Sequence, residues 1–350
     1  MHGLLLHAPH DVRHATDLPD PRVEAPGDAV VAVAASGLCG SDLHPYEGRE
    51  PFRPDVVPGH EAVGVVVEVG DAVRGFGPGD RVLVPFTTSC GTCGPCRRGL
   101  SARCVHGALF GWGDPDDLTV PALHGGQAQH LRVPHADGTL VAVPDGRDDL
   151  DAVLLADNLP TGWTAVERLG DVRGATVAVQ GLGSVGLCAV WSALRLGADR
   201  VVGIDPVAAR RQRAERLGAV TAAPEAGPEL VTEATGEGVA GVVEAAGVTA
   251  AQAAAVRLVR PGGVVSLISV QTEEAFGFSP ITLYDRNLTV VSGRAPVRSA
   301  LDRLLAHLDG VALPTDVVIT HPDVPLADGA ATYATFAARE AGLVKAVFRP

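Results

Sequence analysis

The stretch Thr176–Gly186, TVAVQGLGSVG, decides the fold of the central part of the chain. Its first half is an apolar run of strand length, and its second half has the spacing G-x-G-x-x-G. An apolar segment of helix length follows and ends at Gly197, and a second strand-like run ends at Asp205, 22 residues after Gly183. A glycine-rich turn between a strand and a helix, with an acid ending the next strand, is typical of a dinucleotide-binding Rossmann unit.

The same turn predicts a site for the pyrophosphate of a nicotinamide cofactor, because the exposed N–H groups of a helix N-terminus favour an anion. Asp205 would accept hydrogen bonds from a ribose 2′-hydroxyl and repel a 2′-phosphate, which favours NAD over NADP. Arg210 and Arg211 lie one turn further on and weaken that preference. The turn residues expected at the cofactor are Gly181, Gly183, Ser184 and Gly186.

Further strand-like runs flank this unit and extend the pattern. Residues 241–246 and 263–268 are apolar, with a helical segment at 249–259 between them, and such alternation builds a parallel sheet covered on both faces. Residues 1–36 instead hold short alternating segments separated by Pro and Gly, which indicates a loop-rich antiparallel domain. We therefore predict an α/β chain of two domains; the family resemblance described below implies that residues 156–291 are inserted between residues 1–155 and 292–350.

Composition excludes several classes of function. The net charge of −13 opposes a broad nucleic-acid interface, and no apolar run approaches the roughly 20 residues that span a bilayer. The opening Met1–Leu6 has no basic segment and no cleavage site, so we expect a cytoplasmic protein. Six cysteines in such a chain indicate metal binding before disulfides.

A lobe at about residues 88–106 holds four of these cysteines in the spacing C-x2-C-x2-C-x7-C. Four thiolates form a closed tetrahedral zinc site, which is structural because no position is left for substrate. An iron–sulfur cluster and two disulfides are the alternatives; a ferredoxin-type run, however, would place the fourth cysteine after three residues and follow it with Pro. The predicted structural zinc ligands are Cys90, Cys93, Cys96 and Cys104.

A second set of metal donors lies nearer the N-terminus. The segment GLCGSDLH (37–44) offers a thiol, a hydroxyl, a carboxylate and an imidazole, and GHE (59–61) adds an imidazole and a carboxylate. Thiolate and neutral imidazole are ligands that zinc prefers, and a catalytic zinc uses three protein ligands with one position open. The two segments together therefore indicate a zinc site, and the family resemblance described next implies that Cys39 and His60 are two ligands of a catalytic zinc.

These motifs, in this order, resemble the zinc-dependent medium-chain alcohol dehydrogenases over essentially the whole chain. The resemblance implies a GroES-like catalytic domain built from both termini with a Rossmann domain inserted. It also implies that Asp157, in the segment ADNLPTGW, is the third ligand of the catalytic zinc, as in bacterial members that carry Asp in place of Cys. Glu61 resembles an acid that approaches the metal during ligand exchange, and Asp42 one that orients the ligand histidine.

The resemblance further implies the reaction. Zinc would ease the loss of an alcohol's hydroxyl proton, Ser41 would take that proton, and His44 would pass it to the surface while hydride moves to the nicotinamide. Gly40 replaces a basic residue that some members aim at the phosphates. The remaining positions carried over are Thr161, Val185 and Lys345 at the cofactor, and Phe86, Trp112 and Trp163 as walls of a substrate pocket.

We accordingly expect two zinc ions and NAD, a small-molecule alcohol or aldehyde as substrate, and a homodimer or homotetramer without nucleic-acid or membrane partners. Two other interpretations remain: an NAD-retaining aldehyde dehydrogenase or dismutase, and a non-catalytic zinc- and nucleotide-binding protein of the same fold.

Overall fold

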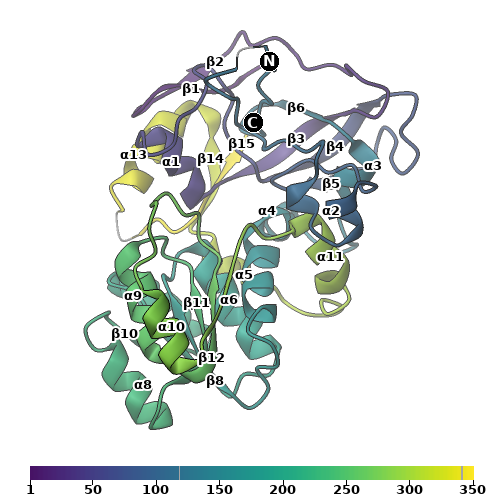
Figure 1. The fold of residues 1–350 in the computed structure, drawn as a ribbon. Coiled ribbons are helices and arrows are strands. Elements are labelled where there is room, and N and C mark those ends of the chain that lie inside the picture. Colours follow the sequence, from purple (N-terminus) through teal and green to yellow (C-terminus); the bar gives the residue numbers. More distant parts are fainter. Residues whose placement is uncertain (118, 340–341) are drawn as a thin grey trace. The chain divides into compact units, whose positions relative to one another are not determined.

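The computed structural model describes residues 1–117, 119–339 and 342–350. The chain divides into two compact units (Figure 1). Unit 1 comprises Met1–Asp157, Pro296–Thr315 and Ile319–Pro350, and unit 2 comprises Asn158–Ala295 with Asp316–Val318. The first unit is therefore assembled from both ends of the chain.

Unit 2 is built on a parallel sheet whose strand order is β10-β9-β8-β11-β12-β13. The first strand in sequence, β8, is central, and the chain extends the sheet first to one side and then to the other, as in a doubly wound fold. The predicted parallel sheet of the Rossmann type is thus confirmed. The strands are β8 (Thr176–Gln180), β9 (Arg200–Ile204), β10 (Val220–Ala222), β11 (Val239–Glu244), β12 (Val259–Leu267) and β13 (Thr289–Ser292).

Helices cover both faces of this sheet, with α9 and α10 on one side and α5 and α6 on the other (Figure 1). The double cover explains why the central strands are apolar without alternation; Val177, Ala178 and Val179 are all fully buried. The helices of unit 2 are α5 (Asn158–Glu167), α6 (Ser184–Arg195), α7 (Ala208–Arg216), α8 (Gly227–Thr235), α9 (Thr249–Leu258) and α10 (Pro280–Arg286).

The strand expected at 263–268 begins earlier than its apolar run suggests. β12 starts at Val259, directly after α9, and its first residues include the exposed segment 260–262. The sequence Arg-Pro-Gly-Gly does not predict a strand here, because Pro and Gly usually mark turns. β12 still pairs in parallel with β11 and with β13.

Unit 1 is organised around a seven-stranded sheet of order β14-β15-β3-β4-β5-β7, in which β6 also pairs with β3. All of its pairs are antiparallel except β14 with β15. A separate hairpin joins β1 (Gly3–Ala8) to β2 (Asp11–Ala15). The strands of the large sheet are β3 (Ala29–Leu38), β4 (Ala62–Val69), β5 (Arg81–Val84), β6 (His130–Val133), β7 (Val141–Ala142), β14 (His321–Pro325) and β15 (Ala346–Arg349).

Two apolar cores lie in unit 1. One packs β1 and β15 against Tyr333 and Phe336, and the other lies under β3, β4 and β5. The helices of unit 1 are α1 (Leu43–Tyr46), α2 (Gly94–Arg97), α3 (Ala136–Thr139), α4 (Asp149–Ala156), α11 (Val297–Leu305) and α13 (Gly329–Ala337). The short helix α12 (Thr315–Val318) begins in unit 1, and its last three residues belong to unit 2. Among the described residues, no helix has the length and apolarity needed to cross a bilayer.

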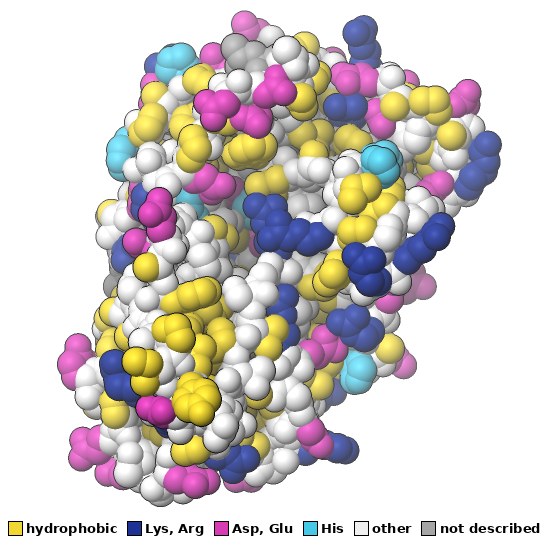
Figure 2. Space-filling view, viewed as in Figure 1, with side chains coloured by type: hydrophobic (Ala, Val, Ile, Leu, Met, Phe, Trp, Pro, Cys, Tyr) yellow, Lys and Arg dark blue, Asp and Glu magenta, His cyan; other side chains and the backbone are white. Residues whose placement is uncertain are grey.

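Exposed apolar side chains gather on unit 2 over α10 and the loop before it (Figure 2). Phe276 is 57% exposed, Ile281 70% and Tyr284 83%. The neighbouring strand β13 is an edge strand of its sheet. Exposed apolar side chains beside an unpaired strand edge are characteristic of protein–protein contact surfaces.

Candidate functional site

Cys39 is placed by the end of β3 and the turn that follows it. The strand ends at Leu38, and Cys39 then caps a short 3-10 turn, Gly40–Asp42. The Asp42 carboxylate closes this turn by accepting a hydrogen bond from the Cys39 backbone N–H at 2.9 Å. The local sequence therefore holds the thiol in one orientation, and Cys39 is 6% exposed.

His60 and Glu61 reach the same place through strand pairing. They lie just before β4, which pairs antiparallel with β3, and the Gly37 N–H donates to the Glu61 carbonyl at 2.9 Å. Gly59 precedes them with φ of +93°, a conformation that a side chain would strain. The β3–β4 ladder thus brings the second motif opposite the first.

The other carboxylate oxygen of Asp42 contacts His60 and orients its ring. The two groups are 3.0 Å apart, from His60 Nδ1 to Asp42 Oδ1, and because a carboxylate only accepts, Nδ1 carries the proton and Nε2 is left for a metal. Burial would lower the pKa of His60, but the Asp42 carboxylate raises it well above its usual value. The surroundings therefore favour a positive charge at this imidazole, and a bound metal ion can provide that charge in place of the proton.

Asp157 completes the cluster from the end of α4. Its Oδ2 lies 3.6 Å from Cys39 Sγ and 3.7 Å from His60 Nε2. Zinc bonds of about 2.0–2.3 Å at tetrahedral angles imply ligand–ligand distances of roughly 3.3–3.8 Å, so these three donors fit one zinc ion. One donor atom of Glu61 lies within 4.8 Å of each of the others. All four residues belong to unit 1.

Lys345 is buried beside this cluster. It is the only lysine of the chain, and its Nζ forms an ion pair with Glu61 Oε2, with neither side chain exposed. Burial would lower the pKa of Lys345, but the Glu61 carboxylate raises it, so the ammonium stays charged. The resemblance led us to expect this residue at the cofactor phosphates; in the structure its ammonium contacts Glu61.

A buried chain of hydrogen bonds supports Asp42 from behind, and sequence reasoning missed it. Tyr333 OH donates to Gln127 Oε1 at 2.8 Å, while Gln127 Nε2 donates to the Gly37 carbonyl at 3.2 Å and to Asp42 Oδ2 at 3.5 Å. Gln127 and Tyr333 are fully buried. No local signal marks them, because they lie 85 residues or more from Asp42 in sequence.

The proposed proton-relay residues lie close to the same cluster. Ser41 Oγ is 3.2 Å from His60 Nε2. His44 is 9% exposed, and its Nδ1 has no hydrogen-bond partner among the described residues. Burial, reinforced by the positive charge of Arg49, lowers the pKa of His44 to about 4. His44 is therefore neutral near neutral pH.

The four cysteines of the lobe converge around α2. Their four sulfur atoms all lie within 4.8 Å of one another, and Cys93 Sγ is 3.8 Å from Cys104 Sγ. This is the sulfur–sulfur distance expected in a tetrahedral zinc site with bonds of about 2.3 Å. Backbone N–H groups donate to Cys90 and Cys104, as suits thiolates. None of the six cysteines, all in the described part of the chain, forms a disulfide. This geometry fits one closed metal site.

The backbone geometry shows why glycine is needed at particular positions of the turn in unit 2. Gly181 has φ of +81°, and a Cβ on Gly186 would lie 1.8 Å from the Gly181 carbonyl oxygen. A Cβ on Gly183, at the N-terminus of α6, would meet nothing within 4 Å, so that side of the turn is open for a ligand to approach the backbone. The turn thus fits a dinucleotide pyrophosphate.

Asp205 is bound to this turn. Its Oδ2 accepts from the Leu182 N–H and its Oδ1 from the Val207 N–H, both at 2.8 Å, and it is 2% exposed. Arg210 approaches Oδ2 at 3.8 Å, and Arg211 donates to the Asp205 carbonyl. Asp205 therefore supports the shape of the turn in addition to any role with a ribose.

The other predicted residues are distributed over both units. The Phe86 ring meets the His60 ring edge-on with centroids 6.3 Å apart. Trp112 is half-buried in unit 1 and donates to the Pro51 carbonyl at 3.3 Å. Three others belong to helices of unit 2: Thr161 and Trp163, both buried in α5, and Val185, half-buried in α6.

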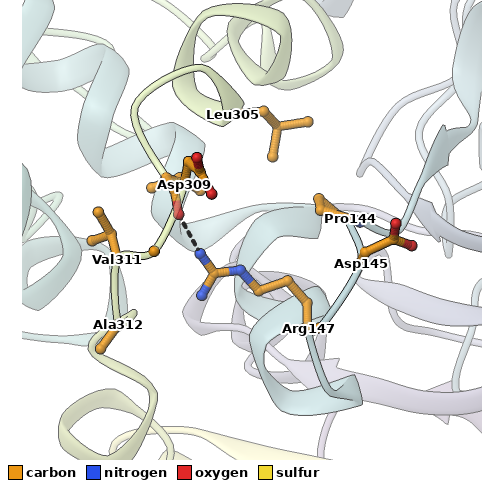
Figure 3. A pocket seen from close by; sticks show the side chains of 10 residues that line it. Pro144, Asp145, Arg147, Leu305, Asp309, Val311 and Ala312 are labelled. Atoms are coloured by element: carbon orange, nitrogen blue, oxygen red, sulfur yellow. Dashed lines mark hydrogen bonds between the residues drawn. The ribbon is translucent and has the colours of Figure 1, made fainter.

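A separate cavity of about 550 Å³ opens between residues 144–147 and 305–312 of unit 1 (Figure 3). Arg147 extends across it and donates to the Leu308 carbonyl at 2.7 Å. None of the predicted site residues lines this cavity. The candidate site is therefore defined by the convergent metal donors.

Comparison with known proteins identifies the family of the chain. The model of the alcohol dehydrogenase GroES-like domain matches residues 25–145, and that of the zinc-binding dehydrogenases matches residues 184–308. A probable zinc-binding alcohol dehydrogenase of Mycobacterium tuberculosis is 41% identical over 334 residues, covering 95% of this chain and 84% of that protein. Zinc-type alcohol dehydrogenase B of Aspergillus flavus is 36% identical, covering 87% and 72%.

Solved structures extend the comparison. Alcohol dehydrogenase TADH from Thermus sp. ATN1 superposes with a TM-score of 0.92 at 34% identity, covering 100% of this chain and 99% of that one. A Sinorhizobium meliloti protein assigned to the zinc-binding dehydrogenases, solved with NADP bound, gives a TM-score of 0.82 at 30% identity, covering 100% and 99%.

The two candidate metal sites predict different consequences for substitution of one thiol. Cys93→Ser should remove one zinc per chain and lower the melting temperature by roughly 5 °C or more, because the lobe folds around its metal. Cys39→Ser, the matched control, should also remove one zinc but lower the melting temperature less, since Cys39 and His60 lie beside the ends of the paired strands β3 and β4. Elemental analysis and calorimetry measure both effects; equal losses of stability would contradict the division of roles.

The burial of neutral His44 predicts an acid-dependent loss of stability. Between pH 6.5 and about pH 4 the unfolded chain takes up a proton that folded His44 does not, so the free energy of unfolding decreases as the pH falls through this range. His44→Gln should make this dependence shallower by up to about one proton. Urea unfolding of both proteins in excess zinc tests this; identical slopes would refute it.

Proposed function

Since this chain belongs to the zinc-dependent medium-chain alcohol dehydrogenases, and is thus a zinc-dependent oxidoreductase acting on alcohols, we propose that it interconverts a small-molecule alcohol and its carbonyl compound with NAD. Cys39, His60 and Asp157 hold the catalytic zinc. The observation that supports this most directly is the convergence of their three donor atoms at zinc-compatible distances. The dismutase and non-catalytic interpretations are not favoured, because the relatives are named alcohol dehydrogenases.

The cofactors supply Lewis-acid chemistry that eases loss of the hydroxyl proton, and a hydride acceptor. The chain's own residues do the rest. Asp42 keeps His60 in the tautomer that leaves Nε2 available. Ser41, whose hydroxyl lies 3.2 Å from that nitrogen, would accept the substrate proton and release its own hydroxyl proton towards His44. His44, with its pKa lowered to about 4, holds that proton only briefly before releasing it.

A second zinc serves the structure in this proposal. Cys90, Cys93, Cys96 and Cys104 hold it in a closed site, so the chain carries two zinc ions. We place the protein in the cytoplasm, where thiols stay reduced, because none of the six cysteines forms a disulfide. The exposed apolar side chains beside edge strand β13 support assembly into a homodimer or homotetramer.

The third ligand gives the sharpest test of the proposed activity. Asp157→Ala should lower kcat/KM for alcohol oxidation at least about a hundredfold, because the metal loses one of three ligands. Asp157→Cys, the matched control, supplies a thiolate ligand in place of the carboxylate and should retain far more activity. The measurement is formation of reduced nicotinamide from a panel of alcohols, alongside zinc content. Full activity and full zinc in Asp157→Ala would contradict the assignment.

The charge of Asp205 supports a preference for NAD over NADP. Asp205→Asn keeps an oxygen that can accept from the Leu182 N–H but removes the repulsion of a 2′-phosphate. We expect the ratio of kcat/KM for NADP to that for NAD to rise roughly 5- to 30-fold, the equivalent of about 1–2 kcal/mol. Arg210 then lies close enough to attract the phosphate. An unchanged ratio in a stably folded variant would show that Asp205 does not select the cofactor.

A further inference from the structure

A buried glutamine lies on the apolar side of α9 in unit 2. Gln252 is 1% exposed, and the other buried side chains of this helix are Ala255, Val256 and Leu258. An amide among apolar neighbours is costly to bury unless its donor and its acceptor both have partners. The partners of Gln252 therefore indicate what the residue does.

Hydrogen bonds run in one direction from Gly277 through Gln252 to Glu244. The Gly277 N–H donates to Gln252 Oε1 at 2.9 Å, and Gln252 Nε2 donates to Gln271 Oε1. Gln271 Nε2 donates to Ser269 Oγ at 2.7 Å, and Ser269 Oγ donates to Glu244 Oε2 at 2.6 Å. The direction is fixed, because a backbone N–H only donates and a carboxylate only accepts. Bonds aligned in this way polarise and strengthen one another, and we call these five residues the Gln252 network.

Glu244 connects the Gln252 network to a turn at the carboxyl end of β11. It is fully buried, and its Oε1 accepts from the Ala246 N–H at 2.8 Å and from the Gly247 N–H at 2.7 Å. Gly247 has φ of +71°, a conformation that favours glycine. The shape of the turn 245–247 therefore depends on where Glu244 is held, and Ser269 holds its other oxygen.

The turn 245–247 packs directly on the glycine turn that fits a pyrophosphate. A Cβ on Gly181 would lie 2.7 Å from the backbone nitrogen of Ala246. Gly181 follows β8, which lies between β9 and β11 in the sheet. A dinucleotide binds outside the carboxyl ends of the strands at such a switch point. With the adenosine ribose at Asp205, after β9, the nicotinamide half would extend towards the ends of β11 and β12.

We propose that Gln252 is a positioning residue for the nicotinamide half of the cofactor. Through its network it holds Glu244, and Glu244 holds the turn 245–247 in the shape that this half of the cofactor meets. The adenosine half lies on the side of β9 and does not depend on the Gln252 network. The inference rests on the proposed function, since it assumes a nicotinamide dinucleotide at the glycine turn.

The test measures cofactor binding to the full zinc-loaded chain without alcohol. Gln252→Met keeps the length of the side chain but removes both hydrogen bonds, and it should weaken NADH binding roughly fivefold or more. Binding of AMP, which carries only the adenosine half, should stay unchanged. Gln212→Met, the matched control, makes the same substitution at an exposed position of α7 and should change neither affinity. Isothermal titration calorimetry measures both affinities.

A second variant covers the case in which Gln252→Met does not fold. Gln271→Met breaks the same network at a partly exposed side chain and should have the same selective effect on NADH. An NADH affinity equal to that of the unmodified protein overturns the inference. Equal losses of NADH and AMP affinity also overturn it, because a general loss of structure weakens both. An unmodified protein that binds neither ligand would instead contradict the proposed cofactor site.

Discussion

The antiparallel pairing of β3 with β4 and β15 is the constraint on which the metal site depends. β3 ends at Cys39, the chain enters β4 through His60 and Glu61, and Lys345 precedes β15. The Gly37 N–H bonds to the Glu61 carbonyl, which fixes the register of the two motifs. A shift of one residue in this pairing would therefore move His60 and Glu61 relative to Cys39. The sheet thus places two of the three proposed zinc ligands, and the end of α4 places Asp157.

Electrostatics explains why this arrangement calls for a cation. Cys39, Glu61 and Asp157 bring acidic groups into a volume that excludes water, and burial raises the pKa of the Cys39 thiol. The pKa values of His60 and Lys345 are raised by the same group of acids, because nearby carboxylates stabilise the protonated form of each base. A divalent ion and one ammonium balance three negative charges. Hydrogen bonds from Gln127 and Tyr333 then keep Asp42, and through it His60, in place.

Several parts of both sites could be predicted because they are local. The thiol, hydroxyl and carboxylate of residues 39–42, the pair His60–Glu61 and the four cysteines each lie within one turn or loop, where backbone geometry limits how far residues can separate. The glycine turn is equally local, and its strand–turn–helix context predicted the parallel sheet that unit 2 contains. The start of β12 was misjudged because the Arg-Pro-Gly-Gly segment has the composition of a turn.

The sequence by itself determined the two kinds of unit, the clusters of metal donors and the family, since periodicity and short spacings are properties of the chain. Resemblance, and not spacing, pointed to Asp157, which lies 118 residues from Cys39. Only the tertiary structure revealed Gln127 and Tyr333 behind Asp42, the attachment of Asp205 to the glycine turn, and Lys345 against Glu61. These contacts join segments that are far apart in sequence. They depend on strand register and burial, which cannot be read from the order of the residues alone.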